Sequence, residues 1–228
     1  MIANIVFDFL LKGGPVMVPI LICALVAVAV VGERSFWWLR ESRRREPVKL
    51  ERVLAALENG DLTTATQIAQ GSNDPIIRMI YRGLNHVHTS LQGALQLAAG
   101  IELERAGRFL MVMDTLVTLA PLLGLLGTVT GLMRAFLSVG TAELSVVAVT
   151  GGIGEALIAT ACGLGIAIIS LIPFNYFTGR LTRLQFELEA AATNVEMMIA
   201  PTQPAGETAV RLEARRRTGA PVEPGLSK

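Results

Sequence analysis

The sequence has few charged residues, cysteines and histidines. It has two cysteines and two histidines in 228 residues, and Asp, Glu, Lys and Arg make up only 17% of the chain. Cys23 and Cys162 lie in apolar stretches and form no CxxC pattern, so neither a disulfide framework nor a cysteine metal site is expected. His86 and His88 are two residues apart, a poor metal spacing on a helix, and no cofactor is expected. A net charge of +1 gives no reason to propose nucleic-acid binding.

Charge is missing altogether from three windows of the chain, residues 13–32, 115–133 and 156–179. Each contains about 20 residues, roughly the length that a helix needs to cross ~30 Å of hydrocarbon. The chain is also 52% hydrophobic, with a mean hydropathy of +0.53. These features predict an all-α membrane protein with three transmembrane helices.

Positive charge is placed unevenly around these windows. Residues 34–52 are rich in Lys and Arg, whereas the segment before the first window has only Lys12. The link over residues 135–150 has no Lys or Arg, and Arg180 and Arg183 follow the third window. The positive-inside rule therefore predicts that the N-terminus lies outside and that the C-terminus lies in the cytoplasm. The N-terminus lacks the basic start and cleavage site of a removable signal peptide, so the first span is expected to stay in place.

Charge and helix-stop signals divide the chain into eight predicted segments. They are an N-terminal interfacial helix (1–12), a first transmembrane helix (13–38), a cytoplasmic helical region (39–110), a second transmembrane helix (111–137), a periplasmic turn (138–144), a third transmembrane helix (145–179), a cytoplasmic helical extension (180–200) and a disordered tail (201–228). Asp61 and either Asn73 or Asp74 are expected to cap short helices in the cytoplasmic region. No helix breaker follows Ser90, which predicts one rod over residues 90–137 with at most a kink at a proline.

One carboxylate stands in the third apolar stretch. Between Leu144 and Gly179 the only charged residue is Glu155. An ionisable side chain inside a membrane is costly, and such residues commonly lie on an ion or proton path. Counted from Leu144, Glu155 lies some 16 Å deep, whereas counted from Ala156 it lies at the membrane surface. The sequence leaves both depths open.

Small residues are spaced along one face of the second and third windows. Gly124, Gly127 and Gly131 follow one another in the second, and Ala159 and Gly163 lie in the third. Small residues at such spacings let membrane helices approach closely. These five positions are expected to pack helices or to line a pore, and packing alone stays open as the simpler interpretation.

Two threonines are candidate partners of Glu155. In an antiparallel hairpin that turns over residues 138–145, Thr128 lies level with Glu155 and Thr160 lies about 7.5 Å deeper. A carboxylate beside hydroxyl groups can accept a proton, lose it and pass it on, which predicts a proton pathway through these three residues. The alternative is that each hydroxyl bonds to a carbonyl of its own helix. Arg134 is expected to extend to the outer interface.

Three stretches resemble the proton channel family that contains ExbB, TolQ and MotA. They read GGPVMVPILICALVAVAVVGER, LAPLLGLLGTVTGLMRAF and GGIGEALIATACGLGIAI, and the likeness covers about residues 10–200. The ExbB/TolQ branch is the closer one, because MotA has four spans. By position, Glu155 corresponds to the pore glutamate, Thr160 to the threonine after it and Thr128 to the threonine of the second span.

The resemblance implies an inner-membrane homo-oligomer, in ExbB a pentamer, around a central pore. It also implies partners: an ExbD/TolR-like single-span protein with an intramembrane Asp, a TonB- or TolA-like protein, and the surrounding membrane lipids. Proton flow would then drive work at the outer membrane. A TolQ-like role in envelope maintenance, a non-conducting scaffold, and sodium in place of protons stay open. An intramembrane enzyme is disfavoured because the spans contain no histidine and one buried acid.

Overall fold

The computed structural model describes residues 13–85, 90–139 and 146–199. The predicted interfacial helix, most of the predicted turn, the two histidines and the predicted tail lie outside these ranges. The described parts of Met1–Arg45 and Gly100–Glu187 form one compact unit, called here the first unit. Those of Glu46–Ala99 and Leu188–Lys228 form the second unit.

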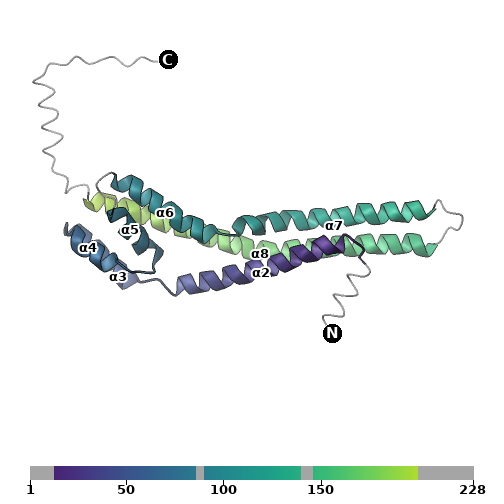
Figure 1. Ribbon diagram of the computed structural model, residues 1–228, viewed down its shortest axis with the longest axis horizontal. Coiled ribbons are helices and arrows are strands. Elements are labelled where there is room, and N and C mark those ends of the chain that lie inside the picture. The colour runs from purple at the N-terminus through teal and green to yellow at the C-terminus, as the bar shows by residue number, and fades with distance from the viewer. Residues whose placement is uncertain (1–12, 86–89, 140–145, 200–228) are drawn as a thin grey trace, which may run out of the picture. The chain divides into compact units, whose positions relative to one another are not determined.

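Three helices of the described residues are long and apolar enough to cross a membrane. They are α2 (Met17–Ser42), α7 (Leu110–Val139) and α8 (Val146–Ile199). All regular structure in the described ranges is helical, which confirms the predicted all-α class with three spans. Figure 1 shows α7 and α8 side by side in the first unit, with α2 along them, and both continue beyond the N-terminal end of α2.

The first span packs one face against the other two. Met17 and Ile20 of α2 are buried against Ala159 of α8. Further along α2, Cys23 is buried in a cluster that includes Leu116 of α7. Because lipid tails are as apolar as these side chains, close packing rather than exclusion of water holds such helices together.

The rod predicted over residues 90–137 is broken in the structure. Helix α6 (Leu91–Gly107) ends, and α7 begins only at Leu110. Between them Phe109 has a φ of 64°, a left-handed backbone that bulky residues adopt rarely. Pro121, the one position where the prediction allowed a kink, lies inside α7. The prediction of one unbroken helix was therefore wrong.

Arg34 of α2 occupies this break. Its side chain is 1% exposed, and its Nη1 donates a 3.3 Å hydrogen bond to the carbonyl oxygen of Ala106. That carbonyl lies in the last turn of α6, where no helical amide is available to it. The guanidinium also lies 5.6 Å from the centroid of the Phe109 ring, and Glu33 accepts two further bonds from it at 2.6 and 2.9 Å. A buried cation from α2 thus stabilises the junction of α6 and α7.

The second unit is built from three short helices and the adjoining parts of α6 and α8. The short helices are α3 (Pro47–Glu58), α4 (Leu62–Ala69) and α5 (Pro75–Leu84). Asp61 caps α4 by accepting from the Thr64 amide at 2.9 Å, and Asp74 caps α5 by accepting from the Ile76 amide at 2.9 Å. Both caps were predicted, and the hydrogen bonds from Thr64 lower the pKa of the Asp61 carboxyl below its usual value. The core contains Val53, Leu57, Ala65, Ile77, Ile80 and Leu95.

Candidate functional site

The carboxylate of Glu155 has a charged partner on the neighbouring helix. Arg134 Nη1 of α7 donates to Glu155 Oε1 of α8 at 2.7 Å. The Glu155 side chain is 20% exposed and that of Arg134 is 44% exposed. This pair joins the two helices at one level, and it places a fixed positive charge beside the carboxylate.

Gly14, just before α2, forms the other wall of the site. A Cβ atom added to Gly14 would lie 1.6 Å from Glu155 Oε1, so a side chain there would displace the carboxylate from this position. The backbone of Gly14 has a φ of +69°, which glycine adopts without strain. Glu155 is therefore positioned by three elements of the first unit: α7, α8 and the segment that leads into α2.

These contacts locate Glu155 relative to the helices. It is the tenth residue of α8, which begins at Val146, so it lies about 13 Å along the axis from that end. Yet it lies level with Gly14, which precedes the first residue of α2. Glu155 therefore lies well inside the helix when counted from the start of α8, but at the edge when compared with the start of α2, because α7 and α8 extend beyond the start of α2 (Figure 1). The sequence left open two depths that differ in the same way.

Thr160 connects α8 to α7. Its hydroxyl lies 2.9 Å from the carbonyl oxygen of Gly124 and 3.2 Å from that of Ala156, and can donate to either. The bond to α7 is possible because Gly124 has no side chain. A Cβ there would lie 3.0 Å from the Cα of Thr160.

Thr128 has its hydrogen bond within its own helix. Its hydroxyl donates to the carbonyl oxygen of Leu125 at 2.7 Å, and among the described residues this is its one side-chain hydrogen bond. The structure thus gives the two threonines different partners. Glu155 is paired with Arg134 rather than with either hydroxyl.

The small residues lie where α7 and α8 come closest. Gly127 faces Ala159, and a Cβ on Gly127 would lie 2.4 Å from that of Ala159. Gly131 faces Gly152, with 2.9 Å between an added Cβ and the Gly152 carbonyl oxygen. Gly163 is the tightest position against backbone, since a Cβ there would lie 2.5 Å from the Ala120 carbonyl oxygen. These pairings agree with the hairpin register predicted from the sequence.

Comparison with known proteins identifies the group to which this arrangement belongs. A family model described as the MotA/TolQ/ExbB proton channel family matches residues 71–190, which include α7, Arg134, Glu155 and Thr160. The chain belongs to this family. As a member of it, the chain is a multi-pass membrane protein of the proton channel class.

Several proteins to which the chain is similar carry the name ExbB or ExbB-like. The biopolymer transport protein ExbB-like 1 of Synechocystis sp. is 35% identical over 199 residues, which cover 84% of this chain and 78% of that protein. The ExbB-like 3 protein of the same organism is 35% identical over 184 residues, 78% of this chain and 87% of that protein. The biopolymer transport protein ExbB of Xanthomonas campestris is 41% identical over 86 residues, 37% of this chain and 34% of its own length.

Sequence reasoning missed two residues of this family member's site. Arg134 was expected at the outer interface, because it ends a charge-free window, and it was not connected to Glu155. Counting residues along the hairpin places Arg134 and Glu155 at different levels. The long arginine side chain covers this difference, which a count of residues does not take into account. Gly14 was missed because its role depends on backbone conformation and on a contact with a helix far along the chain.

Proposed function

We propose that this chain is a proton-conducting stator subunit of an ExbB–ExbD-like inner-membrane motor. The motor converts proton motive force into work on a TonB-like protein for outer-membrane transport. One observation carries the proposal: Glu155, the single charged residue of the third apolar stretch, lies within hydrogen-bonding distance of a cation on the adjacent span. Intramembrane carboxylates of this kind mark ion and proton paths.

The pair with Arg134 supports a gated site rather than an open one. A carboxylate held at 2.7 Å from a guanidinium is not free to carry protons continuously. A second acid, brought by a partner helix such as an ExbD/TolR-like span with an intramembrane Asp, would compete with Glu155 for Arg134. Release of Glu155 would then depend on the partner's position, which couples proton movement to motion of the partner.

The surface of the spans supports a homo-oligomeric housing, for which we propose the pentamer of ExbB. Gly124, Gly127, Gly131, Ala159 and Gly163 of α7 and α8 contact each other within the chain. Contacts with other copies would therefore use the large apolar side chains that remain exposed: Leu122, Leu125 and Val129 on α7, and Leu157, Leu164 and Ile168 on α8. The same faces suit lipid where no copy covers them.

The relatives' names favour biopolymer transport over the TolQ-like role in envelope maintenance. A non-conducting scaffold is the competing class. The Arg134–Glu155 ion pair is compatible with it, because an ion pair between two helices can hold them together without conducting protons. The two classes differ in what loss of the carboxylate does to assembly.

The test replaces the carboxylate by an amide of the same shape. Glu155→Gln is expected to reduce proton uptake by cells that co-express the chain and its single-span partner to background, with the oligomer unchanged on native gels. Glu104→Gln is the matched control, because Glu104 is an exposed acid on α6 outside the spans. Proton uptake at the wild-type rate in Glu155→Gln would overturn the proposal. Loss of the oligomer in both Glu155→Gln and Arg134→Gln would establish the scaffold instead.

A further inference from the structure

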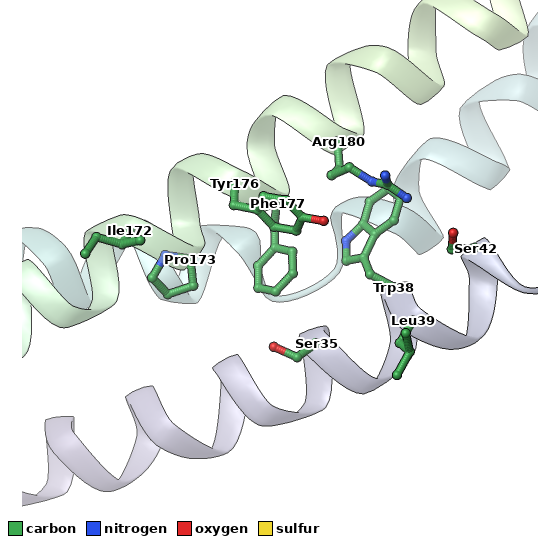
Figure 2. Close-up of a pocket in the computed structure, with 9 residues that line it drawn as sticks. All are labelled: Ser35, Trp38, Leu39, Ser42, Ile172, Pro173, Tyr176, Phe177 and Arg180. Carbon is green, nitrogen blue, oxygen red and sulfur yellow. The ribbon is translucent and has the colours of Figure 1, made fainter.

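A cavity of about 460 Å³ lies between α2 and α8 in the first unit, near the basic end of the spans (Figure 2). This size falls within the range of small-molecule sites, roughly 300–1,000 Å³. Its walls come from residues 35–42 of α2 and 172–180 of α8. The cavity is therefore separate from the site at Glu155.

The walls of the cavity change from apolar to polar along its length. Figure 2 shows Ile172 and Pro173 at one end, and Arg180 and Ser42 at the other, with Phe177 between them. On α8 the apolar end points back into the charge-free window, and the polar end lies where that window stops. A ligand that fits this gradient has an apolar tail toward the middle of the span and a polar head at the interface.

The polar end of the cavity offers donors that lack acceptors. Arg180 lies over the ring of Trp38, 5.3 Å from its centroid, and within the described residues no carboxylate pairs with it. Trp38 Nε1 is buried and finds no hydrogen-bond acceptor in the same part of the chain. Guanidinium and indole groups can only donate, and an unpaired buried donor is unfavourable. Trp38 is the buried donor and Arg180 is half-buried, so a ligand with negatively charged acceptor oxygens matches this end of the cavity.

We propose that this cavity binds one anionic phospholipid of the adjoining leaflet. Its phosphate lies at Arg180, and one acyl chain follows Leu39, Phe177 and Ile172 toward the middle of the span. Tryptophan and tyrosine side chains favour the headgroup level of a membrane, and basic pockets between spans bind acidic headgroups. A free phosphate ion would satisfy Arg180 alone and leave the apolar half of the cavity empty.

The test uses Trp38 as the reporter. The sequence has two tryptophans, so the full-length protein with Trp37→Phe retains Trp38 as its one indole. Phosphatidylglycerol with brominated acyl chains, added in mixed micelles, is expected to quench Trp38 fluorescence at about fivefold lower concentration than brominated phosphatidylcholine. Arg180→Gln is expected to abolish this difference, and Arg180→Lys to retain it. Arg183→Gln, which removes the same charge from an exposed position outside the cavity, should leave it unchanged.

Four results would overturn the proposal. Equal quenching by both lipids in the parent protein would exclude headgroup recognition. A preference that survives Arg180→Gln would assign it to the general basic surface. Reversal of quenching by inorganic phosphate as effectively as by unlabelled phosphatidylglycerol would make the site an anion site, and absence of quenching in the oligomer would mean that a neighbouring copy covers the cavity.

Discussion

Thr160 and Thr128 have the same side chain and different surroundings. The Thr160 hydroxyl reaches the backbone of the other helix at Gly124, whereas the Thr128 hydroxyl is satisfied one turn back at Leu125. A hydroxyl bonded to its own helix adds little to the contact between helices. A hydroxyl bonded across helices contributes both energy and register.

Replacing each threonine by valine tests this difference, because valine keeps the branched shape and removes the hydroxyl. Thr160→Val is expected to lower the free energy of unfolding by about 0.6 kcal/mol, the typical value for a hydrogen bond between membrane helices. Thr128→Val should leave it unchanged. Unfolding of the purified protein in mixed micelles measures both. Equal effects of the two substitutions would contradict the interhelical role of Thr160.

A site residue could be predicted where its neighbours in the sequence set it apart. Glu155 was found because a charge among apolar residues is conspicuous in the sequence alone. The acceptor of Thr160 could not be found that way, since a backbone carbonyl has no identity in a sequence and becomes accessible only where Gly124 permits it. The proton pathway through Glu155, Thr160 and Thr128 stays a prediction.

At the scale of elements, the contact between α7 and α8 is a seam of backbone against backbone. Gly163 lies against the Ala120 carbonyl, and Gly131 lies against that of Gly152. Backbone cannot move aside as a flexible side chain does. The seam therefore tolerates no additional atoms at these positions, although other glycines of α8 lie in open space.

Two glycines of α8 that are two residues apart provide the test. Gly163→Ala is expected to destabilise the protein by roughly 1–3 kcal/mol, the usual range for overpacking. Gly165→Ala is the control, because a Cβ at Gly165 has no neighbour within 4 Å. Thermal unfolding in detergent distinguishes them. If Gly163→Ala were as stable as Gly165→Ala, the seam would not be as close as the structure has it.

The break between α6 and α7 is a helix end that the local sequence does not predict. Neither Arg108 nor Phe109 breaks helices, so the pattern from Ser90 onward predicts continuity. The helix ends before Phe109, whose backbone is left-handed, and Arg34, 72 residues earlier, bonds to the Ala106 carbonyl at this point. The caps of α4 and α5 were predictable for the opposite reason, since each aspartate acts on an amide two or three residues away.

At the scale of the whole molecule, the placement of basic residues supports one orientation. Residues 34–52 and the residues after Gly179 contain Lys and Arg, whereas residues 135–150 contain none. Basic flanks are retained in the cytoplasm during insertion. We therefore expect the N-terminus and the link between α7 and α8 to be periplasmic, and the C-terminus to be cytoplasmic.

Reporter fusions measure this orientation. Alkaline phosphatase, which is active only outside the cytoplasm, is expected to be active when inserted after residue 141 and inactive when fused after residue 90. A green fluorescent protein fused to Lys228 should fluoresce, as it does when it folds in the cytoplasm. The reverse pattern of phosphatase activity would show that the positive-inside rule does not govern this chain.

The contact of Arg34 with Ala106 also has a consequence for biosynthesis. At about 5–20 residues per second, the 72 residues that separate them take roughly 4 to 14 s to synthesise. During that interval Arg34 enters the membrane interface without its carbonyl partner, and Glu33, already made, can accept two of its hydrogen bonds. Glu33 can therefore satisfy part of Arg34 during insertion, until α6 and α7 have been made and their junction forms around Arg34.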